Sequence, residues 1–251
     1  LDPPRESPEA ARSILQTLDE IGLHWDGSVL YQSQRLAAYQ QGLKRLAEQE
    51  LIFYCKCTRK DVQANGGIYP GTCRKRRQEP AKGKFAIRCL VDERTISFED
   101  LYQGSQSIQM QQVGDFVIRR KDGLFAYQLA VVMDDAWQGI SHVIRGIDLL
   151  DSSPRQLYLQ QVLGLASPVY GHIPVIVNQQ GQKLSKQHFA KPVDGRDSQK
   201  LLLQALAYLQ QEPDPALAGS SNEEILHWAI AHWKPENFRG MREITEFVPT
   251  D

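Results

Sequence analysis

Apolar residues near the start of the chain recur three or four positions apart, as they do on one face of a helix. They stand at Ala11, Ile14, Leu15, Leu18 and Ile21. Ser7 and Pro8 indicate where this helix begins, because a capping hydroxyl before a proline at the first helical position is a helix-start signal. A second run of the same kind predicts a helix that opens at Ser33. Its apolar positions are Leu36, Tyr39, Leu43, Leu46 and Ala47.

Shorter apolar runs follow each helix and predict strands. Residues 29–32 form one such run between the two helices, and residues 51–54 form another after the second helix. Further strands, expected to form a small sheet, lie at 85–91, 107–111 and 116–119. Between 55 and 84 glycine, proline and basic residues dominate, so this stretch is expected to be an inserted knuckle.

Helical and strand patterns alternate again in the second half of the chain. The expected elements are helices at 126–133, from Ser153-Pro154 and at 198–211, and strands at 142–144 and 173–177. A capping box at Ser221 and Glu224 opens a last helix. The whole pattern predicts an α/β core that an insert interrupts and that a small helical appendage follows.

Composition narrows the class of protein without indicating an activity. With 41% hydrophobic and 24% charged residues, the 251-residue chain resembles an average globular protein rather than a fibrous or wholly disordered one. Its 29 basic residues are balanced by 30 acidic ones, so the net charge is close to zero. A polyanion such as a nucleic acid could therefore be bound only by a local cluster of basic residues. No apolar run approaches the roughly 18 residues of a membrane span, and the polar start is unlike a signal peptide. We therefore expect a cytoplasmic monomer with no membrane partner.

Three of the four cysteines lie close together in the inserted stretch. Cys55, Cys57 and Cys73 could bind one tetrahedral zinc ion, because thiolates beside a glycine-rich turn are typical structural zinc ligands. Tyr69 and Cys89 compete for the fourth position, and Cys89 also fits a strand pattern that would bury it as a small apolar residue. A site filled by protein ligands would be structural, not catalytic. The alternative is that these thiols are free and buried.

Two groups of basic residues are candidate anion sites. One is the run Arg74, Lys75, Arg76, Arg77, Lys82 and Lys84, which suits phosphate but could equally be a solvated run of charge. The other is the glycine-led string 181–186, in which Lys183 and Lys186 could converge on a triphosphate and stabilise charge on the departing pyrophosphate. Taken alone, such a string is common in surface loops.

Tyr127 and Arg145 flank the acidic pair Asp134 and Asp135 in the second α/β half, where strand ends and loops line ligand crevices. The guanidinium of Arg145 matches a carboxylate group. The alternative is a structural ion pair between Arg145 and a nearby acid such as Asp148. The sequence by itself leaves both interpretations open.

Together these strings resemble the catalytic core of the glutamyl-tRNA synthetases. The strings are residues 1–6, 22–27, the cysteine knuckle, 122–127, 143–146 and the Lys-Leu-Ser-Lys sequence at 183–186. More narrowly, the chain resembles short members without an anticodon-binding domain, since 65 residues follow Lys186. The resemblance implies an α/β, Rossmann-like class I core with a zinc-knuckle insert and a small C-terminal helical appendage. It also implies activation of L-glutamate by ATP with Mg²⁺, and transfer to the queuosine base in the anticodon loop of tRNA(Asp).

The resemblance assigns roles to individual residues. Lys186 matches the lysine of the mobile ATP loop that binds the nucleotide phosphates, and Lys183 matches its supporting catalytic lysine. Tyr127 and Arg145 match glutamate-binding positions. The structural zinc ligands match Cys55, Cys57, Tyr69 and Cys73. Of the two candidates for the fourth zinc ligand, the resemblance thus favours the tyrosine.

The resemblance also divides the chain into parts. These are the first half of the core at 1–54, a zinc-containing acceptor-type insert at 55–114, the second half of the core with the ATP loop at 115–195, and the appendage at 196–251. The family's first strand, its His-Ile-Gly-His-like nucleotide motif and a glutamate-binding acid precede the position of Leu1. We therefore expect a few dozen further residues at the start of the natural protein, and no catalysis from a polypeptide that began at Leu1.

Two other functions stay open from the sequence. The chain could be a fragment of an ordinary glutamyl-tRNA synthetase that charges tRNA(Glu). Alternatively, it could be a non-catalytic module that binds tRNA through the basic run at 74–84.

Overall fold

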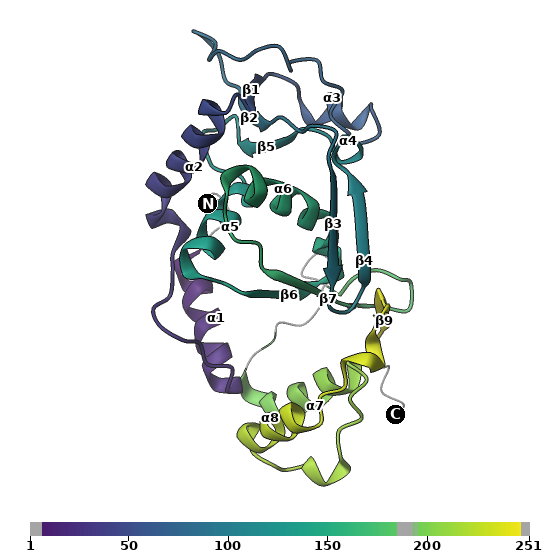
Figure 1. Ribbon diagram of the computed structural model, residues 1–251. Coiled ribbons are helices and arrows are strands. Elements are labelled where there is room, and N and C mark those ends of the chain that lie inside the picture. Colours follow the sequence, from purple (N-terminus) through teal and green to yellow (C-terminus); the bar gives the residue numbers. More distant parts are fainter. Residues whose placement is uncertain (1–6, 185–192, 194, 247–251) are drawn as a thin grey trace. The chain divides into compact units, whose positions relative to one another are not determined.

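The computed structural model describes residues 7–184, 193 and 195–246, which form two units (Figure 1). The first unit comprises residues 29–143 and 149–171. The second comprises 7–28, 144–148 and the described part of 172–251. Each unit has a hydrophobic core of its own.

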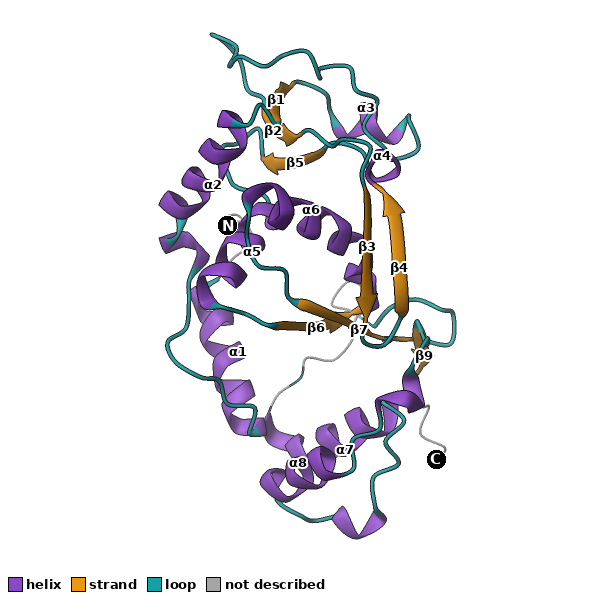
Figure 2. Ribbon diagram, in the orientation of Figure 1, coloured by secondary structure: helices purple, strands orange, loops and turns teal. Residues whose placement is uncertain are grey.

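Two sheets contain the strands of the first unit (Figure 2), although residues 144–146 and 172–173, at the ends of two of these strands, belong to the second unit. In the antiparallel one, the order is β1 (Ile52–Cys55), β2 (Ala86–Cys89) and β5 (Phe116–Arg119). In the other, the order is β4 (Gly104–Gln109), β3 (Thr95–Asp100), β7 (Val169–Ile173) and β6 (His142–Gly146). Strands β3 and β4 form a hairpin, and β3 runs parallel to β7 where Asp100 lies beside Tyr170.

Three helices pack with these sheets around the main core. They are α2 (Leu36–Glu48), α5 (Tyr127–Gln138) and α6 (Ser153–Leu163). The buried face of α2 consists of Tyr39, Gly42, Leu43 and Leu46. Gly42 lets α2 approach α5 closely, because an added Cβ would lie 2.8 Å from the sulfur of Met133. Two short helices complete this unit, α3 (Arg59–Gln63) and α4 (Met110–Val113).

A buried carboxylate also joins α2 to α5. Asp134 on α5 accepts hydrogen bonds from the Tyr39 hydroxyl at 2.6 Å, the Gln32 amide at 3.1 Å and the Arg35 guanidinium at 3.1 Å. Burial, followed by the hydrogen bond to Asp134, raises the pKa of Tyr39, so its phenol stays protonated and donates. The Arg35 guanidinium also stacks on Trp137, 4.4 Å from the ring centre. Of the acidic pair at 134–135, Asp134 therefore has a structural role in holding α2 and α5 together.

The second unit is mainly helical. Its helices are α1 (Pro8–Ile21), α7 (Ser198–Tyr208) and α8 (Asn222–Ala231), and its strands are β8 (Val175–Val177) and β9 (Glu243–Thr245), which pair in parallel. The side-chain amide of Asn222 donates to the Glu20 carbonyl and to the Ser198 hydroxyl, which ties the start of α8 to α1 and α7. Among the described residues, no helix has both the length and the apolar character needed to cross a membrane.

Local capping signals in the sequence are confirmed, whereas the strand predicted at 29–32 and the helix start predicted at Ser33 are wrong. Ser7 caps α1, and Ser221 with Glu224 forms the capping box of α8. Residues 29–32, however, are not a strand, because Val29 and Tyr31 are exposed and have no strand partner within the described chain. Residues 32–34 form a turn of 3-10 helix, so α2 begins at Leu36 and not at Ser33.

The strands expected at 85–119 do not form one sheet. Strands β2 and β5 belong to the antiparallel sheet, whereas β4 pairs with β3, which the sequence pattern did not predict. The single run expected at 173–177 is two strands, because Pro174 lacks the N–H that a continuous ladder needs.

Replacing Asp134 by alanine tests how strongly this carboxylate holds α2 on α5. Asp134→Ala leaves the buried Tyr39 hydroxyl and the Arg35 guanidinium without their acceptor, so the free energy of unfolding should fall by about 3 kcal/mol. Urea denaturation followed by tryptophan fluorescence measures the change. The control is Glu48→Ala, which breaks an exposed pair with Lys44 and should cost less than about 0.5 kcal/mol. Equal losses in the two variants would contradict this role.

Candidate functional site

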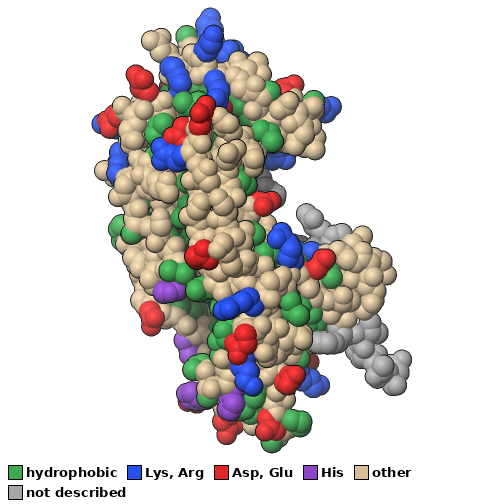
Figure 3. Space-filling model, turned by 45° about the vertical axis from the view of Figure 1, so that its right-hand side comes forward, with side chains coloured by type: hydrophobic (Ala, Val, Ile, Leu, Met, Phe, Trp, Pro, Cys, Tyr) green, Lys and Arg blue, Asp and Glu red, His purple; other side chains and the backbone are tan. Residues whose placement is uncertain are grey.

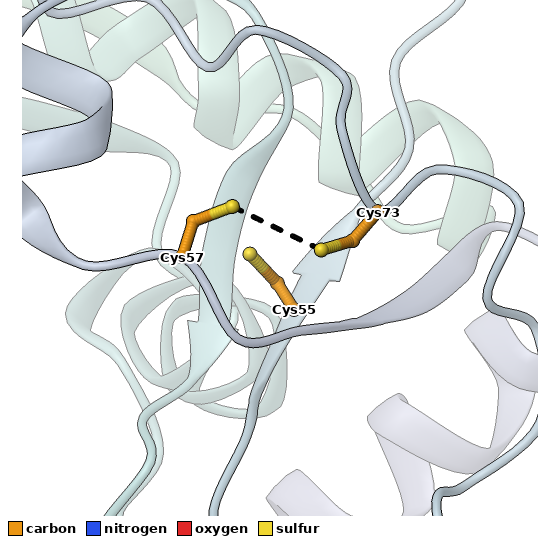
Figure 4. Close-up of side chains that lie close together, drawn as sticks. All are labelled: Cys55, Cys57 and Cys73. Carbon is orange, nitrogen blue, oxygen red and sulfur yellow. Dashed lines mark hydrogen bonds between the residues drawn. The ribbon is translucent and has the colours of Figure 1, made fainter.

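The inserted stretch brings three thiols to one point (Figure 4). Cys55 ends β1, Cys57 follows it, and Cys73 comes from the next loop. The Cys57 and Cys73 sulfur atoms are 3.8 Å apart, and all three sulfurs lie within 4.8 Å of one another. The Tyr69 hydroxyl lies among them, 3.5 Å from the Cys55 sulfur and 3.8 Å from that of Cys57.

These separations fit one tetrahedral zinc ion. With Zn–S bonds of about 2.3 Å and a Zn–O bond of about 2.0 Å, tetrahedral geometry places two sulfurs about 3.8 Å apart and a sulfur about 3.5 Å from the oxygen. The observed sulfur–sulfur distance of 3.8 Å and sulfur–oxygen distances of 3.5 and 3.8 Å match this arrangement. These three distances, together with sulfurs that all lie within 4.8 Å of one another, are compatible with one shared metal ion.

Polar neighbours favour the thiolate form at Cys73. Burial alone would raise the pKa of this thiol, but a backbone hydrogen bond from Lys56 and the Tyr69 hydroxyl lower it to about 7. The Arg76 guanidinium lies 3.6 Å from the Cys73 sulfur and acts in the same direction. Burial raises the pKa of Cys57 instead, so Cys57 ionises less readily than Cys73.

Cys89, the other candidate for the fourth ligand, lies elsewhere. It is fully buried on β2 within the main core, whereas Cys55, Cys73 and Tyr69 belong to a separate cluster around the knuckle. Burial raises the pKa of the Cys89 thiol, which keeps it neutral. The sequence left open that Cys89 is buried on a strand as a small apolar residue. The structure shows this arrangement.

A second buried carboxylate holds the knuckle on the antiparallel sheet. Arg74, next to Cys73, donates to both oxygens of Asp115 at 2.7 and 2.8 Å, and to the Val91 carbonyl at 3.0 Å. Asp115 also accepts from the Val91 backbone N–H at 3.0 Å. The Arg88 guanidinium donates to the Asp115 carbonyl and lies 4.1 Å from the centre of the Tyr69 ring. The ring of Tyr69 is thus held by a network that starts at Asp115.

This network changes the interpretation of the basic run at 74–84. Arg74 pairs with Asp115, Arg76 faces the Cys73 sulfur, and Arg77 donates to the carbonyls of Glu50 and Ile52. These three arginines therefore hold the knuckle together. All six basic residues of the run are nevertheless exposed, so the run also presents positive charge at the surface.

The predicted glutamate-binding residues lie in different units. Tyr127 is the first residue of α5 in the first unit and is 46% exposed. Arg145 lies on β6 in the second unit, where its Nε donates to Nε2 of the buried His172 at 3.1 Å. Because a guanidinium only donates, Nε2 of His172 carries no proton. Sequence reasoning missed His172, since its partner is 27 positions away and no motif links the two.

The predicted ATP loop is described only at its start. Lys183 follows a turn at 178–182, and its ammonium lies 2.5 Å from a carboxylate oxygen of Asp148. Asp148, the acid that the sequence offered as a partner of Arg145, therefore pairs with a lysine of the loop. Lys186 lies outside the described residues.

Residues 1–210 match the family model of the class I tRNA synthetases for glutamate and glutamine, catalytic domain. This chain belongs to that family. The α/β class I synthetase core predicted from the sequence is thereby confirmed.

Curated relatives of this synthetase family cover most of the chain. The glutamyl-Q tRNA(Asp) synthetase of Pseudomonas entomophila is 48% identical over 246 residues, which are 98% of this chain and 83% of that protein. The protein of the same name from Pseudomonas putida KT2440 is 50% identical over 236 residues, or 94% of this chain and 78% of the relative.

Solved synthetase structures show the same fold. The crystal structure of a glutamate tRNA ligase from Elizabethkingia meningosepticum, in complex with its amino acid, has a TM-score of 0.73 and 21% identity. It covers 96% of this chain, which spans 58% of that longer protein. The glutamate-tRNA synthetase of Elizabethkingia anophelis gives a TM-score of 0.74 at 22% identity.

Proposed function

We propose that the chain activates L-glutamate with ATP and transfers the glutamyl group to the queuosine base in the anticodon loop of tRNA(Asp). As a class I tRNA synthetase it is a ligase. The observation that carries the finer proposal is its 48–50% identity to glutamyl-Q tRNA(Asp) synthetases over nearly its whole length. In the reaction, a glutamate carboxylate oxygen attacks the α-phosphorus of ATP and pyrophosphate leaves. A hydroxyl of the modified base then attacks the acyl carbon, and AMP leaves.

Two lysines would stabilise the first step. Lys186 is proposed to bind the ATP phosphates, with Lys183 beside it, where their ammonium groups meet the charge that builds on departing pyrophosphate. Asp148 supports this role for Lys183, because its carboxylate holds the ammonium in place near the start of the loop. Mg²⁺ bound with ATP would neutralise further phosphate charge.

The amino acid would be bound by Tyr127 and Arg145. The guanidinium of Arg145 can form paired hydrogen bonds to a glutamate carboxylate, and His172 fixes its orientation through Nε. His172 therefore acts on the substrate through Arg145 and is a positioning residue. Tyr127, the first residue of α5, is the other proposed glutamate-binding residue.

A structural zinc ion would complete the insert. Its proposed ligands are Cys55, Cys57, Tyr69 and Cys73, whose donor atoms have tetrahedral spacing. We further propose that the protein acts in the cytoplasm as a monomer.

The two alternatives have less support. A fragment of an ordinary glutamyl-tRNA synthetase is less favoured, because the relatives at 48–50% identity bear the name glutamyl-Q tRNA(Asp) synthetase. A non-catalytic tRNA-binding module is less favoured because the relatives at 48–50% identity are named as synthetases.

Pyrophosphate exchange tests the activation step. The complete natural protein should exchange labelled pyrophosphate into ATP when L-glutamate is present, with or without tRNA. Lys186→Ala should reduce this rate by at least about 100-fold, because a charge stabiliser of the transition state is removed. Lys200→Ala, an exposed lysine on α7, is the matched control and should retain the rate. No glutamate-dependent exchange by the unsubstituted protein would overturn the proposal.

Substitutions at His172 test how Arg145 is held. His172→Phe removes the acceptor of a charged hydrogen bond, worth about 1.5 kcal/mol, so the KM for glutamate should rise about tenfold with a smaller change in kcat. His172→Gln, which keeps a side-chain acceptor, should restore much of the affinity. Circular dichroism of both variants checks folding. A change confined to kcat, or no rescue by glutamine in a folded variant, would contradict the positioning role.

Zinc analysis tests the ligand set. The purified protein should contain about one zinc ion, measured by elemental mass spectrometry, and a chromophoric chelator should remove it faster from Tyr69→Phe. Cys57→Ser should lower the zinc content further. Cys89→Ser, the matched cysteine control in the main core, should keep its zinc. Loss of zinc from the Cys89 variant alone would show that the ligand set is wrong.

A further inference from the structure

A cavity of about 180 Å³ opens on the first unit beside the antiparallel sheet. Its main lining residues are Tyr54, Glu79, Lys84, Phe85, Ile87 and Arg119. They come from β1, β2, β5 and the loop before β2, so the wall of the cavity rests on paired strands. None of these side chains has a role in the activation step or belongs to the thiol cluster.

One wall of the cavity is apolar. The rings of Tyr54 and Phe85 pack edge to face with centres 5.7 Å apart, and Ile87 is buried beside Tyr54 in the strand register. Both rings are only partly buried, so part of their surface borders the cavity. Half-buried aromatic rings with a hydroxyl group at the edge can contact a nucleobase and hydrogen-bond to it.

The rim of the cavity is positive. Lys84 is exposed and has no ion-pair partner among the residues that the structure describes. Arg119 donates through Nε to the Gly123 carbonyl at 3.1 Å, which leaves its other donors for a ligand. Arg120 and Lys121 also line the cavity, but they bind Asp122 and the Lys56 carbonyl. Figure 3 shows Lys and Arg side chains gathered at the end of the first unit that carries β1 and β2.

Glu79 is the one acidic side chain on the lining. A carboxylate among cations would weaken binding of a bare phosphate, but it can accept from a base amino group or a ribose hydroxyl. The combination of aromatic surface, cations and one carboxylate therefore matches a nucleotide better than an inorganic anion.

The volume of the cavity indicates whether its ligand is a free nucleotide or one nucleotide of a longer strand. Pockets that enclose whole small molecules have volumes of about 300–1,000 Å³, so 180 Å³ can hold one base or one phosphate of a larger ligand. Single-stranded RNA is typically recognised by aromatic contact with splayed bases and by cations along the backbone.

We propose that this cavity binds one unpaired nucleotide of an RNA loop, with the base against Tyr54 and Phe85 and the adjoining phosphate at Lys84 and Arg119. Glu79 accepts a hydrogen bond from the base or the ribose. The inference rests on the proposed function, under which the RNA is the anticodon loop of tRNA(Asp). It adds a contact that selects unpaired RNA at a site separate from the residues proposed to activate glutamate.

RNA binding by the complete natural protein tests the cavity. The probe is a fluorescent anticodon stem-loop of tRNA(Asp), read by anisotropy over a range of salt concentrations. Lys84→Ala should raise the Kd about three- to tenfold and reduce the slope of log Kd against log salt by about 0.7, the value for one phosphate contact on a single strand. Tyr54→Phe should raise the Kd with the slope unchanged. Lys82→Ala, an exposed lysine two positions away and outside the lining, is the matched control.

Three further readouts separate the possible outcomes. Pyrophosphate exchange should be the same in Lys84→Ala and Tyr54→Phe as in the unsubstituted protein, and a fully paired RNA duplex should show no effect of Tyr54→Phe. If both variants bind the stem-loop as tightly as the unsubstituted protein and exchange is intact, the cavity does not bind RNA. The proposed function would not be affected by that result. A raised KM for ATP in Lys84→Ala would show that the cavity serves a free nucleotide. Absence of exchange in the unsubstituted protein would instead remove the proposed function.

Discussion

The first unit depends on two of its buried carboxylates, Asp134 and Asp115, which must be fully hydrogen-bonded there. An ionised carboxylate is costly to bury unless donors surround it, so each one determines which side chains have to be near. Asp134 requires donors from α2 and thereby fixes α5, the helix that begins at Tyr127. Asp115 requires Arg74 and the Val91 N–H, and thereby fixes the knuckle on its sheet. Buried charge thus positions both the helix that begins at Tyr127 and the knuckle that carries the proposed zinc ligands.

Strand β1 connects the knuckle to the rest of the unit through its two faces. Successive side chains of a strand point in opposite directions. Phe53 and Cys55 lie in the cluster around the knuckle, whereas Ile52 and Tyr54 pack with the main core. The same four residues therefore supply a thiol to the proposed zinc site and an aromatic ring to the proposed RNA cavity. Under this account a structural metal would stabilise the strand that carries an RNA contact.

The sequence predicts features that depend on neighbouring residues, such as helix caps. It misses strand pairing and hydrogen bonds between residues that are far apart in the chain. The caps of α1 and α8 are local, and both were found. Residues 29–32 have a strand composition but no strand partner in the described part of the chain, which no local pattern can show. The bond from Arg145 to His172 and the pairing of Arg74 with Asp115 join residues 27 and 41 positions apart. The residue pattern suggested the three cysteines and the two lysines as ligands, whereas Tyr69 as the fourth zinc ligand and glutamate as the ligand of Tyr127 and Arg145 came from the family resemblance. The predicted division into four parts stays untested.

Transfer of labelled glutamate to tRNA tests the central claim most directly. The complete natural protein is incubated with ATP, L-glutamate and tRNA(Asp) that contains or lacks queuosine, and with tRNA(Glu) in parallel. The account predicts label on queuosine-containing tRNA(Asp) alone, since only that substrate presents the accepting base. Label on tRNA(Glu), or on tRNA(Asp) without queuosine, would contradict it.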